Sequence, residues 1–495
     1  MSDKVLLAID QGTSSSRAVI FDHELKPLAS AQQEFPQIYP RSGWVEHDPE
    51  AIWGSVAAVT AEVLELARVS PGSITAIGIT NQRETSVVWD RRTGRPIANA
   101  IVWQDRRTAE RCELLRRDGR EETVAAKSGL KLDPYFSATK VQWLLDNVEG
   151  ARARAERGEL AFGTVDSFLA YRLSGGAAHV TDATNASRTM LYNIHEQRWD
   201  EDLLSLFDVP QSLLPEVRES AADFAETSVD FLRDGTPIMG IAGDQQAALI
   251  GQAGFEPGMT KSTFGTGCFM IANTGGEALR SRNQLLTTIA SYIDGQVAFG
   301  LEGSVFVAGS AMQWLRDELQ LIGSAPESEA IARQTGIVDD VYVVPAFAGL
   351  GAPYWDPHAR GAIVGLSRGS SRETLVTATL QAVAFQTHDL VVAMREDGIS
   401  PAVVRVDGGM AANDWFLGFL ASVLDTPVER PANIESTVLG AASLAGLRAG
   451  VLKDIGDLQQ RWQSERIFEP DMTPDVRDQL LAGWSDAVSR TRGAR

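Results

Sequence analysis

A short polar segment, residues 10–16, lies between two apolar runs, residues 5–9 and 17–21. The runs predict two strands joined as a hairpin, and the small residues at its tip leave backbone N–H groups free to surround an anion. Asp10 could orient Mg²⁺ through water, and Arg17 could stabilise a phosphoryl group during its transfer. The segment therefore predicts a phosphate site, although a polar surface hairpin would have the same composition.

Two further glycine-rich turns lie in the second half of the chain. Residues 265–267, Gly-Thr-Gly, connect the runs 259–264 and 268–272, so a second hairpin could face the phosphates from the other side. Residues 407–409, Asp-Gly-Gly, join a predicted strand to a predicted helix, where the glycines allow a flat nucleotide close to the backbone and Asn413 could hydrogen-bond it. One glycine-bearing hairpin in each half suggests a duplicated architecture.

Arg83 and Glu84 follow the run 74–79, which predicts a buried strand with residues 87–89 as its hairpin partner. Neighbouring side chains at a strand end point in different directions. A donating guanidinium and an accepting carboxylate could therefore hold two hydroxyl groups of a small polyol. An ion pair on the surface is the alternative explanation for the same two residues.

Three aromatic residues could complete such a site. Trp103 and Phe269 could form an apolar wall, and Tyr135 could supply a phenolic donor. Packing in a hydrophobic core is the alternative for each of them.

Asp244 is the residue that we expect to act as a general base. It follows Gly243 at the end of the predicted strand 238–242 and opens a helix. A carboxylate in this position can take the proton of an attacking hydroxyl group as the phosphoryl group arrives. The alternative is an acidic residue that only stabilises the start of the helix.

The elements that must position these residues alternate along the chain. Strands interleaved with helices, such as those expected at 244–250 and 413–424, predict an α/β fold with partly parallel sheets. The glycine-rich stretch 251–258 divides the pattern. We therefore expect two domains, residues 1–252 and 253–495, the second ending in a charged helical tail.

Composition excludes several classes of protein. The 495 residues carry a formal charge of −20, which argues against a general nucleic-acid-binding role because that needs a basic surface. Two cysteines, Cys112 and Cys268, make neither a disulfide framework nor a cysteine-based metal cluster. No apolar run approaches the roughly 20 residues of a membrane span, and the first apolar run is too short for a signal peptide. A cytoplasmic protein is expected.

The sequence lacks Gly-Lys-Ser/Thr and GxGxxG, the usual glycine-rich phosphate and dinucleotide motifs. Residues 365–369, GLSRG, match the GxSxG pattern of a hydrolase nucleophile, with a possible strand at 362–364 and His388 downstream. However, Ser370 and Glu373 predict the start of the following helix, so the helix would begin after the motif and not at its serine.

Ten stretches between residues 10 and about 450 make the chain resemble the FGGY family of carbohydrate kinases. The resemblance implies two actin-like (ribonuclease H-like) ATPase domains with the active site in the cleft between them. It also implies in-line transfer of a phosphoryl group from ATP to glycerol with Mg²⁺, which gives sn-glycerol 3-phosphate in the first step of glycerol catabolism. The stretches are DQGTSSSRAVIFD, GITNQRET, VWQDRR, SGLKLDPYFSATKVQWLL, GIAGDQQAAL, FGTG, LEGSVFVAGSAMQWLRD, PAFAGLGAPYWDPHARGAIVGLSRG, VDGGMAAND and STVLGAASLAGL.

The resemblance also implies roles for individual residues. Asp244 would be the catalytic base, and Asp10 and Asp244 would lie near the magnesium ion. The residues expected to contact glycerol are Arg83, Glu84, Trp103, Tyr135, Asp244, Gln245 and Phe269. The residues expected to contact the nucleotide are Thr13, Ser14, Ser15, Arg17, Thr266, Gly309, Gln313, Gly409 and Asn413.

Other functions remain open at this stage. Within the family, the substrate could be another polyol or ketose, such as xylulose or gluconate. Outside it, a nucleotide-driven interaction protein would use the same phosphate hairpins, and a serine hydrolase would use the GLSRG string. We also expect a homo-oligomer, a dimer or a tetramer.

The segment before the strand at 238–242 predicts how the enzyme responds to regulators. Some bacterial relatives have a glycine–arginine loop for fructose 1,6-bisphosphate here, whereas residues 231–237 lack the Gly-x-Arg arrangement and include an acid. Residues 221–237 also contain no histidine, which relatives regulated by phosphocarrier proteins have in this region. Titration with fructose 1,6-bisphosphate in a kinase assay should therefore leave the activity unchanged, and strong inhibition would contradict this prediction.

Overall fold

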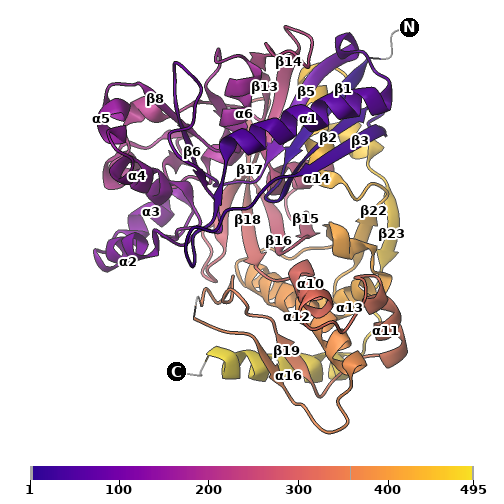
Figure 1. Ribbon diagram of the computed structural model, residues 1–495. Coiled ribbons are helices and arrows are strands. Elements are labelled where there is room, and N and C mark those ends of the chain that lie inside the picture. Colours follow the sequence, from indigo (N-terminus) through magenta and orange to yellow (C-terminus); the bar gives the residue numbers. More distant parts are fainter. Residues whose placement is uncertain (1–3, 357, 493–495) are drawn as a thin grey trace.

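The computed structural model describes residues 4–356 and 358–492. The outer limits expected for the two domains, residues 1 and 495, lie outside the described residues. Two mixed β-sheets form the framework, one in the N-terminal half (residues 4–252) and one in the C-terminal half (residues 253–492), and the first lies above the second in Figure 1.

The first sheet consists of β13 (Ala221–Glu226), β14 (Pro237–Gly243), β5 (Ile74–Asn81), β1 (Val5–Gln11), β2 (Ser15–Phe21) and β3 (Pro27–Glu34), in that order. β1, β2 and β3 are successive antiparallel strands, whereas β5 and β14 continue the sheet in parallel with β1. Because side chains alternate along a strand, Leu7 and Ile9 pack against α1 (Pro49–Ala67) and α6 (Val165–Leu173). Leu6 packs against α14 (Ser436–Arg448) on the opposite face. Both faces are therefore covered, which explains the nearly continuous apolar runs of β1 and β5.

The second sheet consists of β17 (Leu286–Ile293), β18 (Gln296–Val305), β16 (Cys268–Gly275), β15 (Thr260–Phe264), β21 (Val404–Asp407), β22 (Val428–Pro431) and β23 (Ser464–Phe468). β15, β16 and β18 are antiparallel neighbours, and β21 and β22 follow in parallel with β15. Both sheets thus share a core of three antiparallel and two parallel strands, which confirms the duplicated architecture. One core cluster includes residues of α10 (Gly309–Asp317), α11 (Glu327–Thr335), α12 (Arg372–Glu396), α13 (Asp414–Leu424) and α16 (Pro474–Arg492).

A helical lobe of the N-terminal half lies at the left of Figure 1. The strand formed around residues 87–89, β6, pairs with β8 and not with β5, so the predicted hairpin is wrong. The reason is that β1 and β14 already occupy both edges of β5. This part of the chain contains β4 (Glu46–His47), β6 (Val87–Asp90), β7 (Ala100–Ile101), α2 (Ala109–Arg117), α3 (Glu121–Ser128), α4 (Ser137–Asn147), α5 (Ala151–Glu156), β8 (Leu160–Gly163), β9 (Val180–Asp182), α7 (Ala183–Ala186), β10 (Tyr192–Asn193), β11 (Arg198–Trp199), α8 (Glu201–Leu206) and β12 (Glu216–Arg218).

The C-terminal tail is only partly helical. Between α15 (Ile455–Arg461) and α16, β23 pairs antiparallel with β22. The strand covers an edge that would otherwise expose unpaired backbone groups, and the expectation of a wholly helical tail is wrong there. The two remaining short strands of this half are β19 (Tyr342–Val344) and β20 (Ala362–Val364).

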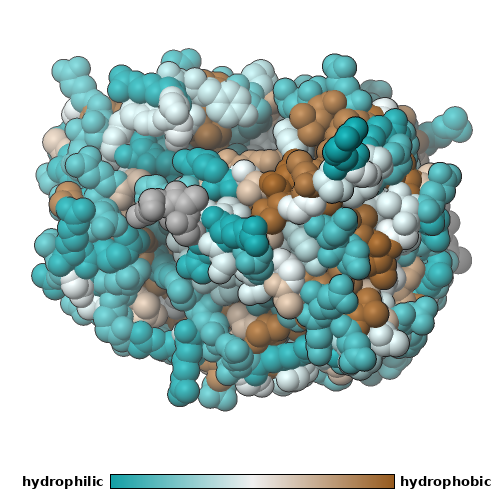
Figure 2. Space-filling view, turned by 90° about the horizontal axis from the view of Figure 1, so that it is seen from below, coloured by the Kyte–Doolittle hydropathy of each residue, from teal (hydrophilic) through white to brown (hydrophobic). Residues whose placement is uncertain are grey.

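The surface seen from below is mostly hydrophilic, with apolar residues gathered in an interrupted band (Figure 2). Charged residues make up 22% of the chain, which agrees with a largely hydrophilic surface. Within the described part of the chain, none of the helices combines the length and apolar character needed to cross a membrane.

Two helices join the sheets through very close backbone contact. A Cβ atom added to Gly440 of α14 would lie 1.8 Å from the carbonyl oxygen of Ala247 in α9 (Asp244–Gly251). One added to Gly251 would lie 2.0 Å from the carbonyl oxygen of Ser436. α9 also contacts β15 and β16 of the second sheet, whereas α14 lies against β1, β5 and β14 of the first. The glycines therefore allow this helix pair to connect the two halves.

Replacing Gly440 by alanine should destabilise the protein, because the new methyl group meets a backbone oxygen that cannot rotate away. Overpacking of this kind typically lowers the free energy of unfolding by about 1–3 kcal/mol. The matched control is Gly54→Ala at an exposed position of α1, where nothing lies within 4 Å of the added atom. Alanine there should stabilise the protein by about 0.5–1 kcal/mol. Thermal denaturation of both variants provides the measurement, and a Gly440→Ala protein as stable as the wild type would contradict the prediction.

Candidate active site

Asp10 and Asp244 meet where neighbouring strands of the first sheet end. Asp10 is paired with Thr80 of β5, and Gly243 of β14 is paired with Asn81 on the other edge of β5. Asp244 comes next and is the first residue of α9. Burial and then the nearby charge of Asp244 raise the pKa of Asp10 to about 7. Burial also raises the pKa of Asp244, so this sheet edge holds two carboxyl groups that are harder to ionise than usual.

Arg83 and Glu84 lie in a buried ion-pair network next to Asp244. Arg83 donates two hydrogen bonds to Glu302, Nη1 to Oε2 at 2.5 Å and Nη2 to Oε1 at 3.1 Å. Arg188 donates from Nε to Oε1 of Glu84 at 2.7 Å and from Nη2 to Oε1 of Glu302 at 2.8 Å. Nε of Arg83 also lies 3.2 Å from Oδ1 of Asp244. The buried ion-pair network (Arg83, Glu84, Arg188 and Glu302) is thus adjacent to the predicted base.

Sequence reasoning missed Glu302 and Arg188. Glu302 is on β18 of the C-terminal half, and Arg188 follows α7 of the N-terminal half. Both are fully buried. The available signal was a single acid inside the apolar run FGLEGSV, because a charged residue in a buried strand needs a partner. Nothing local indicated which residue that partner would be.

Trp103, Tyr135 and Phe269 lie together and form an aromatic wall; the sequence predicted a wall of Trp103 and Phe269 and a donor role for Tyr135. The Trp103 ring contacts Tyr135 and Phe269 edge to face, with centroids 5.6 and 6.1 Å apart. Nε1 of Trp103 donates to Oγ1 of Thr13 at 2.9 Å, which ties the wall to the first phosphate hairpin. Because Phe269 belongs to β16, the wall includes residues of both halves.

A cavity of about 1140 Å³ lies between the halves and reaches this wall. Trp103 and Tyr135 line it from the N-terminal half. The facing apolar residues from the C-terminal half are Phe306, Phe347, Leu350 and Trp355. The wall therefore borders a space large enough to admit a small molecule.

Gln245 is held by a lysine that the sequence did not single out. Nζ of the buried Lys261 donates hydrogen bonds to Oε1 of Gln245, to Oγ1 of Thr263 at 2.8 Å and to the carbonyl oxygen of Phe269 at 3.3 Å. Burial lowers the pKa of Lys261 to about 8. One amine thus fixes two of the residues expected to contact the substrate.

The first of the two predicted hairpins forms, and its role in binding phosphate stays a prediction. Gly12 N donates to Ser15 O at 2.9 Å, which closes the tip that carries Thr13 and Ser14. The hairpin consists of β1 and β2, with Asp10 opposite Arg17.

Arg17 is already engaged in an ion pair. It contacts Glu435, the residue immediately before α14, and its Nε donates to Oγ of Ser30 at 3.0 Å. Glu435 belongs to the C-terminal half and was not expected at this site. The cation that should meet a phosphate therefore has a carboxylate partner from the opposite half.

The second phosphate hairpin lies against the start of α10. Gly309 N donates to Gly265 O at 2.9 Å, and a Cβ on Gly309 would lie only 2.5 Å from that oxygen. The carbonyl oxygen of the exposed Thr266 accepts from the backbone N–H of Ser310 at 3.1 Å. Gln313 follows one turn later on the exposed side of α10. The structure therefore brings Thr266, Gly309 and Gln313 together.

The turn after β21 joins the same region. Gly408 has φ +85°, and a Cβ there would lie 2.6 Å from the carbonyl oxygen of Phe264 at the end of β15. Gly409 has open space around it, as a nucleotide-binding turn requires. Asn413 caps α13 by accepting a hydrogen bond from Phe416 N at 2.9 Å. The side-chain oxygen of Asn413 is therefore already engaged in capping the helix.

The GLSRG string does not form a hydrolase nucleophile elbow. Ser367 is exposed, and its hydroxyl accepts a hydrogen bond from Gly369 N at 3.2 Å. α12 begins at Arg372 with Ser371 as its N-cap, one residue later than expected. The helix thus starts after the motif, as the sequence indicated, and its serine lacks the strand–serine–helix geometry.

Two sheets of the same topology, each with a glycine-bearing hairpin, define an actin-like ATPase fold. Residues 5–251 match the N-terminal domain of the FGGY family of carbohydrate kinases, and residues 260–449 match its C-terminal domain. The chain belongs to the FGGY family of carbohydrate kinases.

Known relatives and structures agree with this assignment. The chain is 58% identical to a glycerol kinase of Rhodospirillum centenum over 489 residues, 98% of each chain. It is 57% identical to a glycerol kinase of Ectopseudomonas mendocina over 490 residues, 99% of each chain. The structure of Plasmodium falciparum glycerol kinase with ADP superposes with a TM-score of 0.91 at 34% identity, covering 99% of this chain and 98% of that one. A xylulose kinase of Lactobacillus acidophilus has a TM-score of 0.88 at 21% identity, covers 99% of both chains and shows a shared fold alone.

Proposed function

We propose that the protein transfers the γ-phosphoryl group of ATP to glycerol, giving ADP and sn-glycerol 3-phosphate, and so begins glycerol catabolism. The observation that carries the proposal is the juxtaposition of Arg83, Glu84 and Asp244, whose polar groups could hold a triol. The relatives described above are glycerol kinases, and a similar structure was solved with ADP. Both comparisons support this choice of substrate and nucleotide.

The substrate site combines directional polar groups with the aromatic wall. A donating guanidinium and an accepting carboxylate suit neighbouring hydroxyl groups, whereas an aromatic face suits the carbon chain. Gln245, held by Lys261, would supply a further amide contact. Orienting the triol in this way would place one terminal hydroxyl group at Asp244, in line with the arriving phosphorus.

Asp244 would accept the proton of that hydroxyl group. Its carboxylate lies near the guanidinium of Arg83, which keeps the charged form accessible although burial raises its pKa. A raised pKa makes the carboxylate a better proton acceptor, and its base form is then lost at a higher pH than for an ordinary aspartate. Turnover should accordingly decline as the solution becomes acidic.

Asp10 and Asp244 fit a magnesium site by the chemistry of their donors. Mg²⁺ prefers oxygen ligands and retains several waters, so one or two carboxylates together with substrate phosphates suffice. Within the described residues, no group of three or more His, Cys, Asp or Glu side chains could hold a metal on its own. Mg²⁺, when bound, would neutralise phosphate charge. Burial, and then the nearby charge of Asp244, raises the pKa of Asp10 to about 7.

ATP would lie between the two phosphate hairpins. Thr13, Ser14, Ser15 and Arg17 would meet its phosphates from the N-terminal half, and Thr266 would meet them from the C-terminal half. The remaining nucleotide contacts that we propose are Gly309, Gln313, Gly409 and Asn413. The matched family domains, residues 5–251 and 260–449, support our division of the chain at residues 252 and 253.

Replacing Asp244 by asparagine should nearly abolish turnover, because the amide keeps the shape of the side chain and cannot accept the proton. General-base assistance typically accounts for about 10²–10⁴-fold in rate. ATP binding should remain measurable by calorimetry, which separates loss of the base from loss of the fold. A variant that retained more than about a tenth of the wild-type rate would exclude this role.

A coupled assay of ADP release tests the substrate. Glycerol, xylulose, gluconate and no acceptor should be compared in the presence of ATP and Mg²⁺, and each component should be omitted in turn. We expect turnover with glycerol to exceed turnover with the other acceptors by at least about 10-fold, since a site built for three carbons leaves the polar groups of a longer substrate unpaired. Slow ATP hydrolysis that no polyol stimulates would indicate an interaction protein instead.

A further inference from the structure

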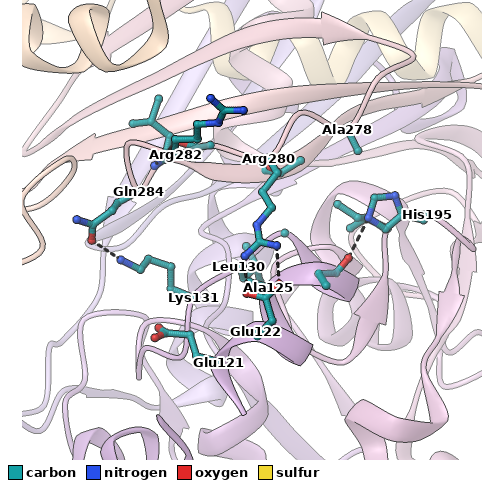
Figure 3. Close-up of a pocket in the computed structure, with 16 residues that line it drawn as sticks. Glu121, Glu122, Ala125, Leu130, Lys131, His195, Ala278, Arg280, Arg282 and Gln284 are labelled. Atoms are coloured by element: carbon teal, nitrogen blue, oxygen red, sulfur yellow. Dashed lines mark hydrogen bonds and ion pairs between the residues drawn. The ribbon is translucent and has the colours of Figure 1, made fainter. Parts of the chain in front are cut away.

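The two halves are joined by exposed polar contacts and by buried ion pairs. In the pocket shown in Figure 3, Arg280 of the C-terminal half contacts Glu122 of α3, and Lys131 donates to Oε1 of Gln284 at 2.6 Å. The side chains of Arg280 and Glu122 are 63% and 67% exposed. Exposed pairs of this kind contribute little to stability because water and salt screen them.

The pair between Glu302 and Arg83 differs because neither side chain is more than 2% exposed. Glu302 is also the carboxylate to which Arg188 of the N-terminal half donates. Burial opposes its ionisation, but the guanidinium groups of Arg188 and Arg83 outweigh burial and lower the pKa of Glu302. Removing one member of a buried ion pair leaves an uncompensated charge, so these contacts are far more consequential than those in Figure 3.

Glu302 also determines which edge of Arg83 is available to other groups. It accepts from both Nη1 and Nη2, and Nε then faces Asp244 at 3.2 Å. Without this anchor the guanidinium could turn fully toward Asp244 and neutralise it. On the other side of the network, Nε of Arg188 donates a hydrogen bond to Oε1 of Glu84. Glu302 of the C-terminal half thus contacts Arg83 directly and is connected to Glu84 through Arg188.

We propose that Glu302 and Arg188 are positioning residues for the polyol. They hold Arg83 and Glu84 in the orientation that binds the substrate, and this orientation exists only while Glu302 of the opposite half is in place. The proposal rests on the proposed function, since it assigns the polyol to Arg83 and Glu84. It concerns two residues that act through others and do not themselves need to touch the substrate.

The first test is Glu302→Asp, which keeps the charge and withdraws the carboxylate by one methylene group. Displacement of an orienting group by about 1 Å can reduce activity by about 100-fold, so we expect the KM for glycerol to rise at least about 10-fold. The KM for ATP should stay within about two-fold, because Arg83 is not among the residues that we propose to contact the nucleotide. The matched control is Glu429→Asp on β22, where another buried glutamate pairs with Arg405 at 3.2 Å outside this network.

The second test separates positioning from charge balance. Glu302→Gln leaves two guanidinium groups against one remaining carboxylate of the network and should lower the melting temperature. Adding Arg188→Met removes one positive charge, so the double variant should regain much of that stability. Its KM for glycerol should nevertheless remain at least about 10-fold above that of the wild type, because Arg83 still lacks its anchor.

The outcomes of these tests decide whether Glu302 positions the polyol-binding residues or has only a structural role. A Glu302→Asp enzyme with the wild-type KM for glycerol, or one that changes only as much as the Glu429→Asp control, overturns the proposal. A Glu302→Gln/Arg188→Met enzyme with the wild-type KM for glycerol would also overturn the proposal. If the wild-type enzyme uses another polyol, the proposed substrate fails, and the same variants measured with that polyol still test Glu302. If the wild-type enzyme accepts no polyol, both proposals fail.

Discussion

The close contact between α9 and α14 is the constraint on which the arrangement of the site depends. Each helix follows the last core parallel strand of one half, and each packs against elements of the other half. Their backbones touch where Gly440 meets Ala247 and where Gly251 meets Ser436. The Cβ atom of any larger residue at either glycine would overlap the facing carbonyl oxygen. α9 begins with Asp244, and the residue before α14 is Glu435, the partner of Arg17. This helix contact therefore connects the position of the expected base to that of Arg17 in the first hairpin.

Although the chain has a net charge of −20, the candidate site contains several positive side chains that pair with carboxylates. The positive groups at the site are Arg17, Arg83, Arg188 and Lys261, and the last three are buried. Arg17 pairs with Glu435, and Arg83 pairs with Glu302, in both cases across the two halves. Water screens buried charges less than it screens the acidic surface, so the local field near the strand ends depends on these cations together with the carboxylates that pair with them.

The sequence predicted the features that are visible within a few neighbouring residues. Both hairpins, the Arg83–Glu84 pair and the start of α9 at Asp244 follow from apolar runs and the turns between them. The pairing of residues 87–89 was wrong because the sequence does not show that both edges of β5 are already occupied. Glu302 was missed for a related reason. Its partners are more than one hundred residues away, and only tertiary packing brings them together.

The interface between the halves consists of close backbone packing in one region and exposed side-chain contacts in another. The backbone of α14, which is labelled right of centre in Figure 1, contacts the backbone of α9, where overlap energies rise steeply with displacement. On the other side of the molecule, α3 lies at the left of Figure 1. The exposed ion pair of Glu122 and Arg280 joins it to the loop before β17, and water can replace this pair at little cost in free energy. The buried ion-pair network and the aromatic wall connect the halves through side chains, with Arg83 to Glu302 and Trp103 to Phe269 as the cross-half contacts. The residues that we propose to contact a small substrate from both sides are therefore held by side-chain contacts, while backbone packing of α9 against α14 sets the distance between the sheets.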